Sequence, residues 1–558
     1  MPPATPRADA GRSLYLMVQG AASAVGGLFD DARRKLAGRL TVEGRGIRTL
    51  FDSEQRATHG LAWFATYVEA LRQLADYARR LDAAGKLGEI EELIVRIGAG
   101  EYLAQIAGGI PISQNEIVRL ADLGLAPAEV AARWTATLDG LIASGNTAVN
   151  RARLVELLRQ NPETTAGDCG LDEGFDQVRE EMRGFADTEI APHAQDWRRD
   201  GGAVPDGVIR QMVDLGVFSL AAPEEFAGMG LGREAMCIVA EELSRGDLGV
   251  GALLARADLA AQIIFRGGTA QQKQRWLPRI AYGNLLPTVA VTEPDVGSDL
   301  AAVATRAVRS GDTYFVHGSK TRVTHAARAD LIVLLARTNP REPGPRGLSI
   351  LVAEKPRGSE AEPFPAKGLT GRDIEVIGYR GLKEYEIAFD GFAVKADNLL
   401  GGVEGRGFEQ IMQAFGIAAI QTAARAVGVA QAAMEEALGY AISRVQFGQK
   451  TVAFPRVADK IAMMAVEIML ARQLAYHAAR ARDSGDGAEA EAGMAALLAT
   501  RVAWACADNA VQIHGGSGFA VEEPASRLFC DARILGIVDG SAEIHAQVVA
   551  RRLLEAAR

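Results

Sequence analysis

The spacing of hydrophobic and polar residues divides the chain into helical and extended stretches. From residue 11 to about residue 158, apolar residues recur every three or four positions, most regularly over residues 62–81, which predicts amphipathic helices. The same spacing continues over residues 170–287. Over residues 288–400 the helical period is lost, and glycine, proline and aspartate divide the stretch, as they do between strands. Helical spacing resumes after residue 401.

Four stretches of this region have the length and composition of strands: residues 313–323, 331–336, 348–353 and 385–389. Residues 161–168 are small and polar, as in an inter-domain linker. The expected fold class is therefore mainly α with a central all-β domain. We expect four parts: an N-terminal helical extension at residues 1–160, a helical domain at 170–287, a β domain at 288–400 and a C-terminal helical bundle at 401–558.

Composition narrows the class of protein. The 558 residues are 48% hydrophobic and 23% charged, the balance of a globular protein with more than one domain. A formal net charge of −9 gives no basic surface for nucleic acid or an anionic membrane, and no uninterrupted apolar run reaches the length of a membrane span.

The start lacks a signal-peptide pattern and the four cysteines are scattered, so we expect a cytoplasmic protein. The seven histidines show no metal-ligand spacing, so no metal is expected.

Five short segments carry residue types that bind ligands or move protons. They are residues 291–299 (VTEPDVGSD), 318–326 (GSKTRVTHA), 444–448 (RVQFG), 512–519 (QIHGGSGF) and 537–544 (IVDGSAEI). Glycine and proline in the first favour an irregular loop that presents N–H groups to a ligand, and the glycines of the fourth allow close backbone approach. Each segment alone is explained as well by an ordinary turn, strand or cap. Their order along the chain is the specific signal.

In this order the segments resemble the motifs of the acyl-CoA dehydrogenase family, TEPxxGSD, GxKxWITN, RxxFG, QxxGGxGY and YEGTxEI. The resemblance covers residues 170–558 and implies a helical domain, a β-barrel or sandwich, and a C-terminal four-helix bundle. It also implies an FAD-dependent enzyme that dehydrogenates an acyl-CoA between its α and β carbons and passes electrons to an electron-transfer flavoprotein. Three alternatives on this fold stay open: a flavin oxidase similar to nitroalkane oxidase, a lyase-like or desulfinase-like relative with little redox chemistry, and a flavoprotein without enzymatic activity.

The resemblance assigns FAD contacts to particular residues. Thr292 and Thr324 fall where the family hydrogen-bonds the isoalloxazine ring, and Ser298 falls where the loop meets both the flavin and the thioester substrate. Plain strand propensity is the alternative explanation for the threonines. Five residues fall where a neighbouring subunit holds the FAD pyrophosphate and adenine: Arg444, Phe447, Gln512, Gly515 and Gly516. Ser541 and Glu543 also fall near FAD.

Asp539 falls on the family's catalytic base, which is usually glutamate. Removal of the proton α to a thioester needs a carboxylate in a water-poor pocket. Aspartate reaches about 1.5 Å less far than glutamate, and a misplacement of about 1 Å can cost on the order of 100-fold in rate. Ala418 falls where some branched-chain members carry the base, which leaves Asp539 as the candidate. The alternative role for Asp539 is to cap the following helix.

Two arginines indicate a carboxylate in the substrate. Arg256 lies in an almost wholly apolar run, where a buried cation needs either a carboxylate of the ligand or a distant partner such as Glu241. Arg322 stands where the family usually has tryptophan beside the flavin, and it is either a substrate-binding cation or an exposed strand residue. Residues 530–535 and the long N-terminal segment resemble family members that act on short-chain, branched dicarboxylic acyl-CoA substrates such as methylsuccinyl-CoA.

The N-terminal segment, residues 1–160, carries none of the five motifs. Family members are commonly tetramers built from two dimers through helical faces. A helical segment of this length could cover such a face within the same chain, so the resemblance implies a homodimer. The alternative is an unrelated regulatory or partner-binding domain.

Overall fold

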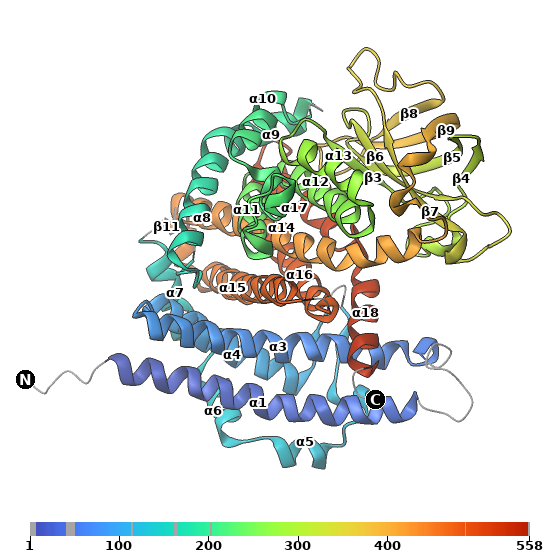
Figure 1. Ribbon diagram of the computed structural model, residues 1–558. Coiled ribbons are helices and arrows are strands. Elements are labelled where there is room, and N and C mark those ends of the chain that lie inside the picture. Colours follow the sequence, from blue (N-terminus) through green and yellow to red (C-terminus); the bar gives the residue numbers. More distant parts are fainter. Residues whose placement is uncertain are drawn as a thin grey trace, which may run out of the picture. The chain divides into compact units, whose positions relative to one another are not determined.

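The computed structural model describes residues 7–40, 51–112, 115–160, 166–200, 203–485 and 487–555. The chain forms two compact units (Figure 1). Unit 1 combines the two ends of the chain, Met1–Gln177 and Thr422–Arg558, and unit 2 is the middle, Val178–Gln421. The boundary after Gln421 falls inside helix α14 (Gly407–Ser443), which therefore contributes to both units. Most of the predicted linker lies outside the described residues.

The helices that precede the sheet are α8 (Glu173–Phe185), α9 (Ala191–Asp200), α10 (Asp206–Asp214), α11 (Gly232–Gly246), α12 (Leu248–Gly267) and α13 (Ala270–Ala281). Polar side chains cap the first turns of α12 and α13. The Asp247 carboxylate accepts hydrogen bonds from the N–H groups of Gly249 and Val250, which starts α12. Thr269 and Gln272 form a reciprocal capping box at the start of α13.

Helix α12 is the core helix of unit 2 and packs against α11. By length and composition alone this helix could cross a membrane, but 89% of its apolar 18-residue stretch is buried inside the protein. Arg256 and Asp258 interrupt its apolar surface near the middle. Core helices of globular proteins pass the same test, so burial explains its composition without a bilayer.

The central sheet has seven strands: β3 (Pro287–Ala290), β4 (Arg306–Ser310), β5 (Thr313–Thr324), β6 (Leu331–Arg337), β7 (Leu348–Glu354), β8 (Leu369–Ile374) and β9 (Glu384–Lys395). The strand order is β3-β6-β4-β5-β9-β8, with β7 paired to β6. β3 and β4 run parallel to β6, and the other pairs are antiparallel. Alternate residues of β5 and β9, including Tyr314, Val316, Ile387 and Phe389, fill one hydrophobic core.

The predicted strands correspond to β5, β6, β7 and β9, and the fold class of helices around a central curled sheet is confirmed. The prediction omitted β3, β4 and β8. β4 and β8 expose most of their residues, so neither shows a hydrophobic alternation along its length.

Unit 1 consists mainly of helices from the two ends of the chain. The N-terminal ones are α1 (Arg7–Arg39), α3 (Gln55–Ala84), α4 (Glu89–Gly108), α5 (Pro127–Arg133), α6 (Ala136–Ser144) and α7 (Ala148–Leu158), with a small hairpin of β1 (Ile110–Pro111) and β2 (Ile117–Val118). The C-terminal ones, besides α14, are α15 (Pro455–Asp483), α16 (Glu489–His514), α17 (Pro524–Leu535) and α18 (Ala542–Glu555). α3 packs against α15, α16 and α18, and Figure 1 shows these blue and red helices side by side.

A buried polar network joins the N-terminal helices to the C-terminal bundle within unit 1. Arg501 of α16 donates hydrogen bonds to the hydroxyls of Tyr67 (2.5 Å) and Tyr102 (3.2 Å) and to Oε1 of Glu467 (2.8 Å). The two tyrosine rings stack with centroids 4.4 Å apart. Burial raises the pKa of Tyr67 to about 12, so its hydroxyl stays protonated and donates to Gln105 at 2.6 Å. The N-terminal helices therefore cover a helical face of the C-terminal bundle within unit 1.

Candidate active site

A buried ion pair fixes the base of the loop at residues 291–299. Lys320 on β5 donates to Oε1 of Glu293 and to the carbonyl of Val291, each at 2.9 Å. The same carboxylate accepts hydrogen bonds from the N–H groups of Ala304 and Thr305, both at 2.8 Å. Burial acts to raise the pKa of Glu293, but the charge of Lys320 and these hydrogen bonds hold it below its usual value. The loop is therefore anchored through a carboxylate whose charged form is favoured.

The anchored loop lies beside the C-terminal part of β5, which carries Thr324. The carbonyl of Thr292 accepts a hydrogen bond from the N–H of Thr321 at 2.9 Å. Thr324 is buried, and its hydroxyl donates to Oε1 of Glu384 at 2.6 Å, a partner that the sequence did not indicate. A hydroxyl that donates in this way keeps an acceptor position for a ligand. Ser298 lies exposed on the far part of the loop.

Strand β5 has a bulge at Arg322. The pairing of β5 with β9 changes register between Lys320 and Val323, and Arg322 has a φ of +53°. A left-handed backbone is uncommon for a residue with a Cβ, and bulges redirect a side chain away from the regular alternation. The Arg322 side chain is exposed on unit 2. Its predicted contact with substrate or flavin stays a prediction.

Arg256 is buried on α12, two residues before a second charged group, Asp258. Asp258 accepts a hydrogen bond of 2.6 Å from Arg233, and Glu241 accepts one of 2.9 Å from Arg179. Arg256 also has polar or electrostatic partners within the protein. Its burial agrees with the sequence pattern, and its role as a receptor for a substrate carboxylate stays a prediction.

In unit 1, Asp539 lies in the turn between α17 and α18 with its side chain 7% exposed. Its φ is +58°, a conformation that aspartate tolerates better than most residues. Its Oδ2 atom accepts hydrogen bonds from Nη2 of Arg425 at 2.7 Å and from the hydroxyl of Thr422 at 3.2 Å. Arg425 Nη2 also donates to Thr422 Oγ1 at 2.8 Å. We call these three residues the Asp539 cluster.

Arg425 was not among the residues that the sequence motifs indicated. The available signal was a lone arginine in an apolar helical run, the same signal that drew attention to Arg256. The neighbouring imidazole of His545 is buried, which lowers its pKa to about 4 and keeps it neutral near pH 7. Arg425 supplies a positive charge in direct contact with the Asp539 carboxylate.

The residues of unit 1 that the resemblance assigns to FAD lie at the surface. Arg444 follows α14, and Phe447 lies at the tip of the hairpin β10–β11 (Val445–Gln446, Gln449–Lys450) with its ring 93% exposed. Gln512, Gly515 and Gly516 lie at the end of α16. Gly515 has a φ of +61°, and a Cβ at either glycine would meet no atom within 4 Å.

These groups fit a dinucleotide. An exposed guanidinium suits a pyrophosphate, an exposed aromatic ring suits an adenine, and an open glycine turn lets a ligand approach the backbone. Ser541 is half-buried and Glu543 exposed, just after the Asp539 turn. The individual FAD contacts stay predictions.

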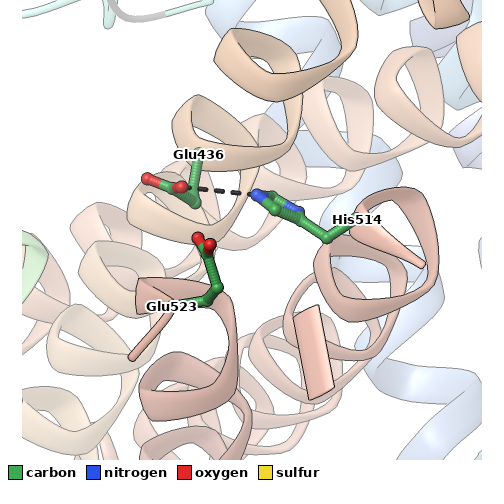
Figure 2. A group of neighbouring side chains, drawn as sticks. All are labelled: Glu436, His514 and Glu523. Atoms are coloured by element: carbon green, nitrogen blue, oxygen red, sulfur yellow. Dashed lines mark hydrogen bonds and ion pairs between the residues drawn. The ribbon is translucent and has the colours of Figure 1, made fainter. Parts of the chain in front are cut away.

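A second cluster adjoins the glycine turn. Figure 2 shows the side chains of Glu436, His514 and Glu523 facing one another, with ligand atoms that all lie within 4.8 Å. His514 Nδ1 lies 2.8 Å from the carbonyl of Ala510, and Nε2 lies 3.3 Å from Glu436 Oε1. Burial acts to lower the pKa of His514, but the hydrogen bond to Glu436 leaves it raised. The contact with Glu436 favours the protonated imidazole, which pairs with carboxylates and does not ligate a metal, so we interpret the cluster as an ion pair.

Three family models match the chain. They are the acyl-CoA dehydrogenase N-terminal domain at residues 172–284, the middle domain at 288–392 and the C-terminal domain at 405–554. With the fold and the motif residues described above, these matches show that the chain belongs to the acyl-CoA dehydrogenase family of oxidoreductases. Members of this family depend on FAD, which is the cofactor of this protein.

Particular relatives extend the comparison. The (2S)-methylsuccinyl-CoA dehydrogenase of Cereibacter sphaeroides is 53% identical over 546 residues, covering 97% of this chain and 98% of that protein. The structure of butyryl-CoA dehydrogenase from Megasphaera elsdenii matches with a TM-score of 0.65 and 30% identity, covering 69% of this chain and 99% of that one. A chain from the structural study of the electron-transferring flavoprotein of Acidaminococcus fermentans matches with a TM-score of 0.64 and 32% identity. The match covers 68% of this chain and 98% of that one.

Proposed function

We propose that this protein dehydrogenates a short-chain, branched dicarboxylic acyl-CoA, with the oxidation of methylsuccinyl-CoA to mesaconyl-CoA as the type reaction. The observation that carries the proposal is the 53% identity to a (2S)-methylsuccinyl-CoA dehydrogenase over 97% of the chain. That match includes the N-terminal helices. The butyryl-CoA dehydrogenase covers 69% of the chain, about the share that the three family domains occupy.

In the proposed reaction, Asp539 takes the proton from the α carbon of the thioester while hydride leaves the β carbon, and a double bond forms between the two carbons. FAD, when bound, supplies the hydride acceptor. The Asp539 side chain is nearly excluded from water and its position is fixed by Thr422 and Arg425. Fixed placement of the base matters because proton transfer requires hydrogen-bonding distance to the reacting carbon.

We further propose that an electron-transfer flavoprotein reoxidises the enzyme. The match to a chain from a structural study of such a flavoprotein supports an association between this fold and that partner. The alternative acceptor is molecular oxygen, as in a flavin oxidase with an aspartate base.

A homodimer is the oligomeric state that we propose. Support comes from unit 1, where α3, α4 and α7 pack against α15 of the same chain and α3 also covers α16 and α18. A face that is buried intramolecularly is not available to a second dimer. Sedimentation analysis should therefore give twice the chain mass of 59.2 kDa, and a tetramer would contradict the proposal.

The experiment that tests the function is anaerobic mixing of the FAD-loaded protein with methylsuccinyl-CoA, followed through flavin absorbance. Rapid bleaching, and slower bleaching with butyryl-CoA, would support the proposed substrate class. No bleaching with either thioester would contradict a dehydrogenase. Rapid reoxidation by oxygen with release of hydrogen peroxide would favour the oxidase alternative, and turnover with the flavin oxidised throughout would favour a lyase-like relative.

A further inference from the structure

The ring of His545 packs against the turn that carries Asp539. A Cβ built on Gly540 would lie 3.2 Å from both Cε1 and Nε2 of His545, closer than ordinary van der Waals contact. The ring therefore fills the space beside the Gly540 backbone. Gly540 has a φ of +108°, directly after the φ of +58° at Asp539. A left-handed backbone at a residue with a Cβ is strained, so surrounding contacts must hold this turn in place.

The backbone of His545 is itself fixed against helix α16. A Cβ at Gly493 of α16 would lie 2.6 Å from Cγ2 of Val549 and 3.3 Å from the carbonyl oxygen of His545, so α16 and α18 approach each other closely at this point. The N–H of His545 donates to the carbonyl of Ser541 at 3.0 Å and closes the first turn of α18. Contacts thus run from α16 through His545 to Gly540, and the ring links the helical bundle to the turn.

The His545 imidazole is not held as an ion pair. Its Nε2 atom is buried and has no hydrogen-bond partner among the residues that the structure describes. Burial lowers its pKa to about 4, and the opposing effects of the Asp539 charge and of a hydrogen bond to the Gly540 backbone are smaller. His514, another buried histidine of unit 1, instead has partners at both ring nitrogens and a raised pKa. His545 therefore acts on the turn as an uncharged ring.

The position of this turn decides where the base lies. This step rests on the proposed function, in which Asp539 removes the α proton of the thioester. Thr422 and Arg425 fix the carboxylate end of Asp539 through its Oδ2 atom. The backbone end is fixed by the turn, and the short aspartate side chain passes any backbone shift on to the carboxylate. A misplacement of about 1 Å can cost on the order of 100-fold in rate.

We propose that His545 is a positioning residue for the base: its ring holds the Asp539–Gly540 turn, and with it the Asp539 carboxylate, at the distance from the substrate that proton removal requires. In this role the imidazole acts through Asp539. Removal of the ring leaves a cavity beside Gly540 into which the turn relaxes. Proton removal then slows, whereas the binding of FAD and of the thioester, which does not depend on the reach of the carboxylate, is retained.

The test follows anaerobic bleaching of the FAD-loaded protein over a range of methylsuccinyl-CoA concentrations, which separates the limiting rate of reduction from the apparent dissociation constant. His545→Ala should lower the limiting rate by roughly 10- to 100-fold and change the apparent dissociation constant by less than about threefold. Val549→Ala is the matched control, because it removes a buried contact between α18 and α16 one turn beyond His545. It should lower the free energy of unfolding in urea and leave the limiting rate unchanged. An equal fall of the limiting rate in both variants would overturn the proposal.

A double-variant cycle tests the contact between the ring and the turn. Gly540→Ala places a methyl group against the imidazole, an obstacle that is absent in the His545→Ala background, so the two rate losses should not multiply in the double variant. Losses that do multiply would show that the ring does not act through Gly540.

Hydrogen exchange of residues 536–542 measures the hold on the turn without substrate. His545→Ala should speed this exchange and Val549→Ala should not, and equal exchange in the two variants would count against His545. If methylsuccinyl-CoA does not bleach the wild-type protein, the proposed function fails, and the exchange measurement still decides whether His545 holds the turn.

Discussion

Lys320 and Glu293 form a buried ion pair with an N–O distance of 2.9 Å between strand β5 and the loop that precedes it. The lysine is fully buried, which lowers its pKa to about 8, and the glutamate is held by two backbone N–H groups as well. The pair fixes the loop that carries Thr292 and Ser298, two of the predicted ligand contacts.

Replacement of Lys320 by methionine should therefore destabilise unit 2 and loosen its FAD contacts. The change leaves Glu293 buried without its cation, which typically costs about 3–5 kcal/mol in the free energy of unfolding. Urea unfolding and the FAD content of the purified protein measure the two effects. The double variant Lys320→Met with Glu293→Gln removes the isolated charge, so its free energy of unfolding should fall by less than that of Lys320→Met alone. If the losses of the two single variants instead add up in the double variant, the two residues are not a coupled pair.

Asp539→Asn should leave FAD bound and abolish its reduction. Amide nitrogen cannot accept the α proton, so the rate of anaerobic flavin bleaching should fall by about 1,000-fold or more. Asp539→Glu keeps the carboxylate but moves it by about 1.5 Å, and a loss of roughly 10- to 100-fold is expected. Unchanged bleaching in the asparagine variant would remove Asp539 from the mechanism.

Arg256→Leu tests the cation that the sequence singled out. If Arg256 binds the substrate carboxylate, the variant should raise KM for methylsuccinyl-CoA at least about tenfold more than for butyryl-CoA. A comparable rise for both thioesters would assign Arg256 to the core of unit 2 instead.

The ion pair between His514 and Glu436 should contribute stability that depends on pH. The native pKa of His514 is raised above 6.5, so its contribution is fully present below about pH 6.5 and is lost as the pH rises through the native value. The difference in unfolding free energy between wild type and His514→Gln should therefore shrink from pH 6 to pH 9. Glu436→Gln should remove this pH dependence, and a difference that grows with pH would contradict the assignment.

Arg501→Met should detach the N-terminal helices from the bundle of unit 1. It leaves Glu467 and two tyrosine hydroxyls buried without their donor, and a loss of about 3–5 kcal/mol is expected. Urea unfolding gives the size of the loss, and hydrogen exchange in α3 and α4 shows whether these helices are affected first. Arg501→Lys retains the charge, so its free energy of unfolding should fall by less than that of Arg501→Met. Protection that is unchanged in both helices would show that the network does not hold them.

The sequence predicted the parts of the fold that repeat a pattern and missed those that depend on distant partners. β5 and β9 are long and largely alternate buried with exposed residues, and β6 and β7 are mostly apolar, buried runs. β4 and β8 expose most of their residues and left no such signal. The bulge at Arg322 depends on the register with β9, which the sequence of β5 alone does not reveal.

The residues of the candidate site divide in the same way, into those that stand in a sequence motif and those whose role depends on a distant partner. Asp539 was found because it stands in a motif with a known order along the chain. Arg425 was missed because its partner lies 114 residues away, and only the folded chain brings the two together. Glu384, the acceptor for Thr324, escaped for the same reason, at a separation of 60 residues.

The N-terminal helices are tethered to the bundle that they cover, so their local concentration around it is set by the length of the chain and not by the amount of protein in solution. An equivalent cover supplied by a second molecule would dissociate on dilution, and its contribution to stability would follow protein concentration by mass action. For this chain, α3 protects α15, α16 and α18 equally at nanomolar and at millimolar levels. A cell that makes very little of this protein still obtains molecules in which that face is closed.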